Sequence, residues 1–397
     1  MMIGRLVLIA VLNLLGYAVL RRLWPAVSSG WRQWTFVSLV ALSLLAWGLP
    51  MLLGIGIHGQ IPVIGAPLKL FSTMWAVAVL IVVLFGTPFV LARWWRQRRS
   101  ASQAGQVTGV VDLERRSVLM SVGRAVPFVA MGTSSAGVVS GISGFEVREL
   151  EVRLRDLPAA LEGFRIGQIT DIHVGPFITT DYLRAAVEAM NSAGVHLQVM
   201  TGDLIDDLSQ VDGTMEALGA CQAPHGMLAI LGNHEHWRGL ESILEGYESL
   251  AKRGAKVRLL VDESHVLEHG GERLRVVGVD YPMSRRNPLL RAQQMRRSAD
   301  VAFQGTSPGE MTLCLAHHPS FFPYAAERGA HLTLAGHTHG GQVAFFGVPL
   351  FWFAFEFMLG RYKQKDSHLY VSGGTGHWLP FRLGVPTEVT ILTLRRA

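Results

Sequence analysis

Five short apolar segments in the second half of this 397-residue chain each run directly into side chains that can bind a metal ion. The polar groups that follow them lie in Thr170–His173, Thr201–Asp203, Gly232–Glu235, Ala316–Pro319 and Ala335–Gly340. Carboxylate and amide oxygens mixed with imidazole nitrogens suit borderline divalent cations such as Mn, Fe, Co or Zn. A Mg or Ca site would show mainly oxygen ligands, and two cysteines are too few for a cysteine-based zinc site.

The segments around these groups predict a sheet that brings them together. From Phe145 onward, short apolar strands alternate with amphipathic helices, such as the one expected from Thr180 to Asn191. In α/β sheets ligands gather at the carboxyl ends of the strands, because successive loops converge there. We therefore expect all five groups at one edge of the fold.

The order of these groups resembles the signature of the calcineurin-like metallophosphoesterases. The matching motifs are Asp171-x-His173, Gly202-Asp203-x-x-Asp206, Gly232-Asn233-His234-Glu235, His317 and Gly336-His337-x-His339. The resemblance covers roughly residues 148–394 and is close to the membrane-anchored YkuE and YaeI-like branch and the transmembrane metallophosphoesterases. It implies an α/β fold, a four-layer αββα sandwich, preceded by an all-helical transmembrane region.

The resemblance also implies two divalent cations, of Mn, Fe, Zn or Co, and a role for each ligand. One cation would be held by Asp171, His173, Asp203 and His339, and the other by Asp203, Asn233, His317 and His337. Such a pair activates a water for direct in-line attack on a phosphoester. His234 would donate a proton or hydrogen bond to the phosphate or leaving group. Asp206 would orient His234, or would instead cap a helix.

The remaining histidines and cysteines lack a motif position. His318 competes with His317 as the ligand, although the family pattern favours His317. The others are interpreted as surface or core residues, with His236 and His377 as candidates to line the pocket: His225, His236, His265, His269, His331, His368 and His377. Cys221 and Cys314 are interpreted as small core residues. Glu235 replaces the Asp that many relatives carry and is not a family ligand.

The first third of the chain has a different chemistry. Residues 1–145 hold 12 Lys or Arg and only 2 acidic residues, whereas the rest holds 24 basic and 28 acidic residues. The excess positive charge flanks hydrophobic stretches, so we expect a lipid bilayer as partner and no nucleic acid. Four apolar stretches are long enough, or nearly so, to cross a membrane: Leu6–Leu20, Phe36–Ile57, Leu70–Ala92 and Ala125–Ser143.

These stretches predict the domain order and the topology. We expect three transmembrane helices in 1–92, a basic cytoplasmic linker in 93–117, a fourth transmembrane or signal-like segment in 118–145, and the catalytic domain in 146–397. Arg-rich loops stay in the cytoplasm, which places the catalytic domain outside the cytoplasm on a bacterial inner membrane. Glu114–Leu119 also resembles an internal twin-arginine export signal. A fourth segment that stays in the cytoplasm as a linker helix would leave the domain inside.

Two segments bear on the substrate. Val343–Leu359, here called the lip, contains six Phe and one Trp and is either an apolar surface that dips into the bilayer or a buried strand pair. The five arginines between 285 and 297 would meet phosphate or form a solvated helix face: Arg285, Arg286, Arg291, Arg296 and Arg297.

The lip favours an amphiphilic substrate. We expect hydrolysis of a phosphodiester or pyrophosphate in a lipid, such as a phospholipid or a UDP-diacylglucosamine-like molecule. The alternatives are a phosphatase or phosphodiesterase for soluble nucleotides or phosphoproteins, and an inactive membrane scaffold. The sequence leaves the oligomeric state open.

Overall fold

The structure is a computed structural model that describes residues 2–53, 65–102, 113–284 and 286–397. The chain forms two compact units. One unit contains Met1–Val139 and Leu379–Phe381, and the other contains Ser140–Trp378 and Arg382–Ala397.

The first unit is helical. Its elements are α1 (Met2–Leu23), η1 (Pro25–Ser28), α2 (Gly30–Leu52), α3 (Gly65–Ser102) and α4 (Leu113–Ile142). Four helices are long and apolar enough to cross a membrane, over Leu6–Leu23, Gly30–Pro50, Gly65–Trp95 and Ser121–Ile142. All four predicted stretches fall on these helices, except that residues 54–57 lie outside the described part of the chain. Four such helices indicate a membrane protein.

The helices differ in two places from the segments expected at 93–117 and 118–145. Helix α3 continues through the basic residues to Ser102, and α4 already begins at Leu113. At about 1.5 Å per residue, the 38 residues of α3 extend about 57 Å, well beyond a hydrocarbon core of about 30 Å. The Arg-rich end of α3 is therefore a helical extension, and residues 103–112 of the expected linker lie outside the described residues.

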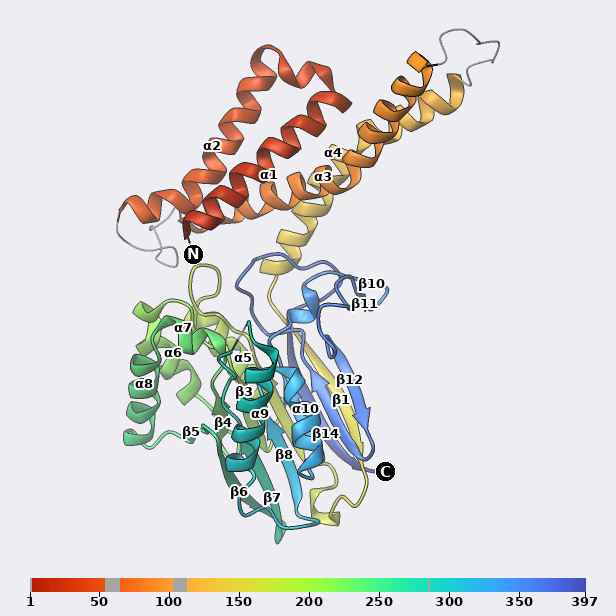
Figure 1. The fold of residues 1–397 in the computed structure, drawn as a ribbon. Helices are drawn as coiled ribbons and strands as arrows, with labels where there is room; N and C mark the ends of the chain where they lie inside the picture. Colours follow the sequence, from red (N-terminus) through yellow and green to blue (C-terminus); the bar gives the residue numbers. More distant parts are fainter. Residues whose placement is uncertain (1, 54–64, 103–112, 285) are drawn as a thin grey trace. The chain divides into compact units, whose positions relative to one another are not determined.

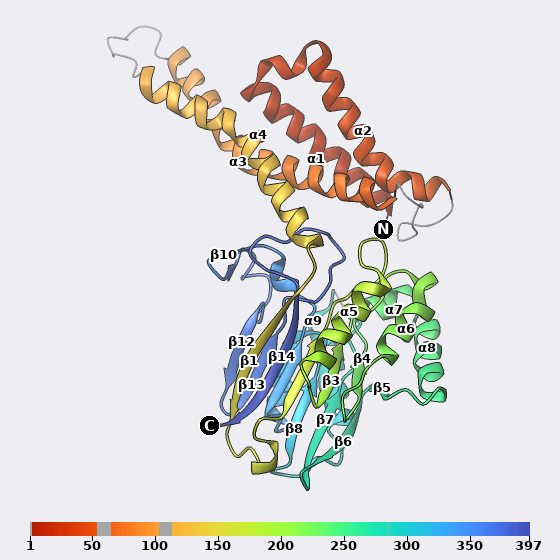
Figure 2. The same ribbon diagram turned by 180° about the vertical axis from the view of Figure 1, so that it is seen from behind.

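The second unit contains two six-stranded sheets (Figures 1 and 2). The first has the order β1 (Glu146–Leu154), β14 (Glu388–Arg396), β2 (Arg165–Ile169), β3 (Leu197–Thr201), β4 (Met227–Ile230) and β5 (Val257–Leu259). The second has the order β12 (Gly360–Gln364), β13 (Ser367–Val371), β9 (Leu332–Ala335), β8 (Met311–Leu315), β7 (Glu272–Gly278) and β6 (Glu263–His269). A separate hairpin pairs β10 (Ala344–Phe345) with β11 (Val348–Pro349).

Helices cover the outer faces of both sheets. The helices of this unit are α5 (Thr180–Ser192), α6 (Val211–Gly219), α7 (Asn233–Arg238), α8 (Leu240–Lys252), α9 (Pro288–Ala302) and α10 (Phe322–Glu327). Single 3₁₀ turns lie at Ala159–Leu161 (η2), Leu208–Gln210 (η3), Pro319–Phe321 (η4) and His339–Gly341 (η5).

Three buried clusters show the layers. Ile166 and Val199 of the first sheet share a core with Leu313 of the second, so the sheets pack face to face. A second core joins the first sheet to α5, α6 and α8, and a third joins the second sheet to α9 and α10. The predicted four-layer αββα sandwich is confirmed. Because both faces of each sheet are covered, its central strands are buried along their whole length, as in β3 and β8.

The strand directions place the polar groups at one edge of each sheet. Strands β2, β3 and β4 are parallel, as are β7, β8 and β9. Strand β14 runs antiparallel to β2, and β1 runs parallel to β14. The amino ends of β1 and β14 therefore lie at the same edge as the carboxyl ends of β2, β3 and β4.

Candidate metal centre

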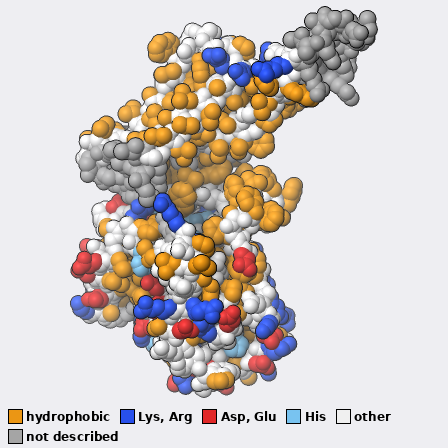
Figure 3. Space-filling view, viewed as in Figure 1, with side chains coloured by type: hydrophobic (Ala, Val, Ile, Leu, Met, Phe, Trp, Pro, Cys, Tyr) orange, Lys and Arg blue, Asp and Glu red, His pale blue; other side chains and the backbone are white. Residues whose placement is uncertain are grey.

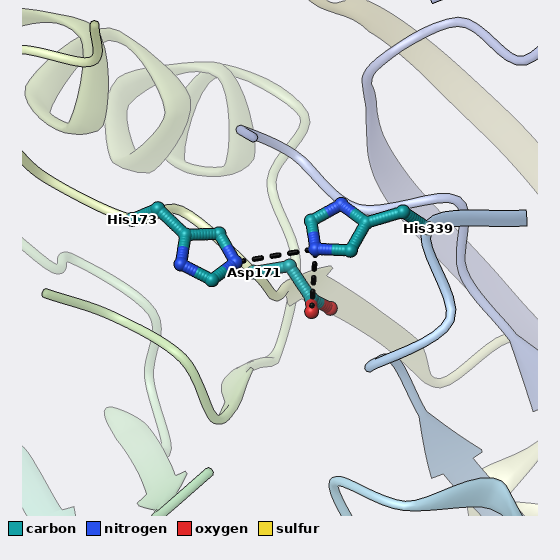
Figure 4. Close-up of side chains that lie close together, drawn as sticks. All are labelled: Asp171, His173 and His339. Atoms are coloured by element: carbon teal, nitrogen blue, oxygen red, sulfur yellow. Dashed lines mark hydrogen bonds and ion pairs between the residues drawn. The ribbon is translucent and has the colours of Figure 1, made fainter. Parts of the chain in front are cut away.

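Three buried side chains form a first cluster: Asp171, His173 and His339 (Figure 4). Asp171 and His173 follow β2, and His339 begins η5 after β9. The His339 Nε2 atom is 3.3 Å from Asp171 Oδ1 and 3.2 Å from His173 Nε2. Residues from both sheets therefore point their ligand atoms at one spot.

A second cluster lies at the carboxyl ends of four strands and contains Asp203, Asn233, His317 and His337. They follow β3, β4, β8 and β9. The His317 Nε2 atom is 3.2 Å from Asp203 Oδ2, 3.2 Å from Asn233 Oδ1 and 3.2 Å from His337 Nδ1. The Nδ1 atom of His317 is 2.8 Å from the Thr201 carbonyl oxygen, which fixes the ring so that Nε2 faces the cluster.

Asp203 lies between the two clusters. Its Oδ2 atom is 3.2 Å from His317 Nε2 of the second cluster and 3.8 Å from His173 Nε2 of the first. Burial alone raises the pKa of Asp203, but His317 and His234 lower it well below its usual value. Asp203 is thus an ionised carboxylate that both clusters share.

The charge states of the ligand histidines differ. Burial lowers the pKa of His337 and of His339 well below the usual value, so both rings are neutral and carry a free lone pair. Burial also lowers the pKa of His317, but Asp203 raises it to about 9. His337 and His339 therefore supply neutral nitrogen ligands, whereas Asp203 favours the protonated form of His317, whose proton a bound cation would displace.

The distances within the clusters fit a divalent cation. Ligand atoms that bind one cation at about 2.1 Å lie about 3 Å from each other. The closest separations within the two clusters are 3.2 and 3.3 Å between nitrogen or oxygen atoms. The seven residues that the sequence indicates as ligands are thus brought together in two groups that each fit one cation.

The backbone is in the left-handed region at five of these seven residues. The φ angles are 53° at Asp171, 57° at His173, 57° at Asp203, 71° at His337 and 51° at His339. Non-glycine residues rarely adopt this conformation, and it is concentrated at functional sites. Each sharp turn aims its side chain across the end of the sheet.

Comparison with known proteins gives the family of this domain. Residues 164–341 match the family model of the calcineurin-like phosphoesterases. The chain carries a calcineurin-like metallophosphoesterase domain. The match contains all seven residues of the two clusters together with Asp206 and His234.

Several curated proteins are similar to the chain outside this match as well. An uncharacterized metallophosphoesterase of Helicobacter pylori strain J99 is 30% identical over 263 residues, which are 65% of this chain and 66% of that protein. The chain therefore spans just under two thirds of that relative. A transmembrane protein with a metallophosphoesterase domain from Bos taurus is 28% identical over 75% of this chain and 67% of its own length. The YkuE metallophosphoesterase of Bacillus subtilis is 27% identical over 67% of this chain and 93% of its own length.

Solved structures resemble the fold more distantly. A dimetal phosphatase from Danio rerio aligns with 15% identity and a TM-score of 0.33, over 54% of this chain and 88% of its own. The family assignment rests on the sequence matches.

Glu235 of the metallophosphoesterase domain fixes the loops of the second cluster. Its buried carboxylate accepts hydrogen bonds from the backbone N–H groups of Leu204 at 2.6 Å and Gly232 at 2.6 Å, and from that of Asp203 at 3.0 Å. The sequence indicated only that Glu235 is not a ligand. Its position three residues after Gly232, at the start of a helix, is the sequence signal for this role.

His234 and Asp206 form a pair beside the clusters. The Nδ1 atom of His234 is hydrogen bonded to Asp206 Oδ1, and Arg238 Nε donates to the same oxygen at 3.2 Å. The Nε2 atom of His234 is 3.9 Å from Asp203 Oδ2. The alternative that Asp206 caps a helix is wrong, because the adjacent Asp207 caps η3 by accepting from the Ser209 N–H group.

The structure separates the two adjacent histidines. His317 lies in the second cluster, whereas His318 accepts a hydrogen bond from the Ser320 N–H group through Nδ1 and caps η4. The His318 ring packs 4.7 Å from the ring of His337. His318 therefore borders the second cluster without facing it.

The other histidines lie in three kinds of place. His236 Nε2 is 2.8 Å from Asp280 Oδ1, and the Asp280 carboxylate raises the pKa of His236. His377 is buried beside the first cluster. The rest are half-buried and away from the ligands: His225, His265, His269, His331 and His368. Cys314 is buried and Cys221 half-buried against the core, as expected.

Arg382 is a site residue that the sequence did not indicate. Its guanidinium is fully buried and donates hydrogen bonds to the carbonyl oxygens of His339, Gly373 and Gly376, at 3.1, 2.6 and 2.6 Å. It ties η5 to the loop after β13, and so fixes the backbone of one ligand. A lone arginine 43 residues after His339 carries no local pattern that would reveal this contact.

The lip is exposed. Strands β10 and β11 form part of it, and Phe346, Phe353 and Trp352 expose 106%, 71% and 65% of their surface. Figure 3 shows hydrophobic side chains gathered over these strands. The alternative of a buried strand pair is wrong, because no second layer covers the described residues of this hairpin. The base of the lip reaches the second cluster, since the Phe355 ring is 5.8 Å from the His337 ring.

The arginines near α9 mostly form a solvated face. Arg286, Arg296 and Arg297 are exposed and Arg291 is half-buried, whereas Arg285 lies outside the described residues. Arg291 is near enough to His318 to lower the pKa of that histidine further, after the larger effect of burial.

Proposed function

We propose that the metallophosphoesterase domain is a phosphoester hydrolase with a dinuclear metal centre. The observation that carries this proposal is the position of Asp203, whose Oδ2 atom faces His317 on one side and His173 on the other. One carboxylate is thereby shared by two ligand groups. Such pairs of cations, when bound, supply a nucleophile from water and neutralise charge on phosphate oxygens.

The ligand sets follow from the two clusters. Asp171, His173, Asp203 and His339 would hold one cation, and Asp203, Asn233, His317 and His337 the other. Asp206 keeps Nδ1 of His234 engaged, so the free Nε2 atom points toward the shared carboxylate. With 12% of its side chain exposed, His234 is accessible to a substrate and is placed to donate a proton or hydrogen bond to the leaving oxygen.

Metal content and hydrolysis test this proposal together. We expect the full-length protein in detergent to bind two divalent cations and to hydrolyse bis(p-nitrophenyl) phosphate. Asp203→Asn should bind fewer cations and lose at least roughly 100-fold in kcat. Asp181→Asn, on the exposed start of α5, is the matched control. A single bound cation, or full turnover in Asp203→Asn, would contradict the dinuclear centre. Comparison with p-nitrophenyl phosphate separates a diesterase from a monoesterase.

We further propose that α1 to α4 anchor the protein in a bacterial inner membrane with the catalytic domain outside the cytoplasm. Arg21 and Arg22 end α1, and further arginines end α3, and such positive charge favours the cytoplasmic side for both of these helix ends. Four crossings then export the domain. Fusions after Ala397 test this topology: alkaline phosphatase should be active and a cytoplasmic fluorescent reporter dark, and the reverse result would place the domain inside.

The lip supports a membrane-facing active site. Strand β1 begins at the edge that carries the metal ligands. The lip lies at the same edge, between η5 and β12. Eight large hydrophobic side chains are exposed there or nearby: Phe345, Phe346, Val348, Leu350, Phe351, Trp352, Phe353 and Trp378. Such a surface is typical of insertion into a bilayer interface.

We therefore propose a lipid phosphodiester or pyrophosphate as substrate, such as a phospholipid or a UDP-diacylglucosamine-like molecule. The lip would bind acyl chains while the phosphate reaches the cations beside Phe355. Phe351→Ser combined with Trp352→Ser should reduce hydrolysis of lipid substrates in vesicles at least roughly 10-fold and leave bis(p-nitrophenyl) phosphate hydrolysis within about twofold. Leu289→Ser, at an exposed apolar position on α9, is the control. Equal loss on both substrates, or no loss on either, would favour soluble nucleotides or phosphoproteins instead.

A further inference from the structure

His377 is a buried histidine that the proposed reaction does not yet use. Its side chain is 1% exposed, and neither ring nitrogen has a hydrogen-bond partner among the described residues. The Phe177 ring lies 6.2 Å away and packs against it. Burying an imidazole with both nitrogens unpaired is unfavourable, and it leaves two polar atoms that a ligand could use.

The backbone on the amino side of His377 is fixed against the first cluster. The Thr375 N–H group donates to the Thr170 carbonyl at 2.8 Å, and the Gly376 N–H group donates to the Asp171 carbonyl at 3.1 Å. Arg382 holds the Gly376 carbonyl from the other side at 2.6 Å. His377 therefore follows directly on a rigid segment that runs beside a proposed metal ligand.

Two glycines show how closely this segment approaches the cluster. A Cβ atom at Gly376 would be 2.1 Å from the Ile172 carbonyl oxygen. A Cβ atom at Gly374 would be 3.1 Å from His339 Nδ1 and 3.2 Å from Asp171 Cβ. Because Gly374 and Gly376 have no side chain, the loop can lie directly against the first cluster. The residue after Gly376 is His377.

We propose that His377 is a substrate-binding residue whose imidazole contacts an oxygen of the phosphoester on the side of Asp171 and His173. This inference rests on the proposed function. Full burial keeps the ring neutral, so it offers one N–H donor and one acceptor. The donor suits a phosphoryl or ester oxygen, and the acceptor suits a hydroxyl group or a water bound to the substrate. His234 lies beside Asp203 and Asp206, and its ring centroid is 4.5 Å from that of His173.

The test uses His377→Phe, which keeps a ring and removes both nitrogens, in the full-length protein in detergent. We expect KM for bis(p-nitrophenyl) phosphate to rise roughly 10- to 100-fold, with kcat within about threefold. The melting temperature should stay equal or rise, because an unpaired buried polar group is removed. His377→Gln, which keeps a donor and an acceptor, should recover part of the affinity. His368→Phe, at the far end of β13, is the control.

The outcomes separate binding from packing. A lower melting temperature with unchanged KM would show that His377 only packs, and unchanged values of both would also overturn the proposal. Binding of inorganic phosphate can be measured without turnover. Phosphate with Mn²⁺ should raise the melting temperature of the wild type but not that of His377→Phe. If the wild type hydrolyses no phosphoester, the proposed function fails, while this phosphate measurement still decides the role of His377.

Discussion

Glu235→Gln should disconnect the two loops of the second cluster. One carboxylate oxygen of Glu235 accepts from the N–H groups of Leu204 and Ile205, at 2.6 and 3.4 Å, and the other accepts from those of Asp203 and Gly232, at 3.0 and 2.6 Å. The amide of Gln offers only one acceptor oxygen. In either orientation of the amide, two of the four buried N–H groups would face the NH₂ group of Gln and lose their acceptor. Each lost hydrogen bond costs about 1–3 kcal/mol.

Two such groups destabilise the domain by about 2–6 kcal/mol, a large part of the stability of a typical domain. For a domain of this size, at about 2–4 °C per kcal/mol, the melting temperature should fall by about 4–24 °C. Since a displacement of about 1 Å costs about 100-fold in rate, hydrolysis should fall at least that far. Thermal unfolding, bound metal and turnover are measured on the full-length protein in detergent.

Glu241→Gln provides the matched control, because this side chain is exposed on the neighbouring helix α8 and has no role in the site. The reasoning is refuted if Glu235→Gln unfolds at the same temperature as Glu241→Gln and retains its metal. In that case the loops would be fixed by the sheet and not by the carboxylate.

Three further predictions concern other parts of the domain. His196 and His225 have pKa values lowered by burial and by the nearby His269, so the unfolded chain binds more protons, and stability should fall as the pH drops below about 6.5. In His225→Gln, the melting temperature should fall less between pH 7.5 and pH 5.5 than in the wild type. An unchanged pH profile would contradict a repulsion between His225 and His269. Arg382→Lys should weaken metal binding about 10-fold in a chelator competition, because a single nitrogen cannot reach carbonyls that are shared between Nη1 and Nη2 of the guanidinium. Wild-type affinity would show that these contacts are dispensable. Gly376→Ala should impair folding or metal binding, because its methyl group would overlap the Ile172 carbonyl; a fully metallated, stable variant would show that the loop can move.

The ligand groups could be predicted because each follows an apolar strand directly in the sequence. Asp171 and Asp203 stand after β2 and β3, and strand direction alone places them at one edge. The layers follow from the same alternation of strands and helices. The family resemblance supplied the division into two ligand sets, and the structure groups the residues in the same way.

Contacts between distant loops could not be predicted. Arg382 meets its three carbonyls through a turn whose conformation has no sequence pattern, and Glu235 acts through backbone N–H groups that every residue type has. The exposure of the lip was also undetermined, because a run of aromatic residues suits a buried strand and an interfacial hairpin equally. Only tertiary packing decides between them.

The ligands come from both sheets, and β1 pairs along its whole length with β14, whose first residue lies 242 positions after that of β1. Neither sheet alone therefore carries all the ligands. During synthesis, β1 also has no paired strand until β14 has been made. A cation that binds only the folded domain would stabilise the folded state by mass action. A product without β14 would lack a central strand of the first sheet and would be unstable.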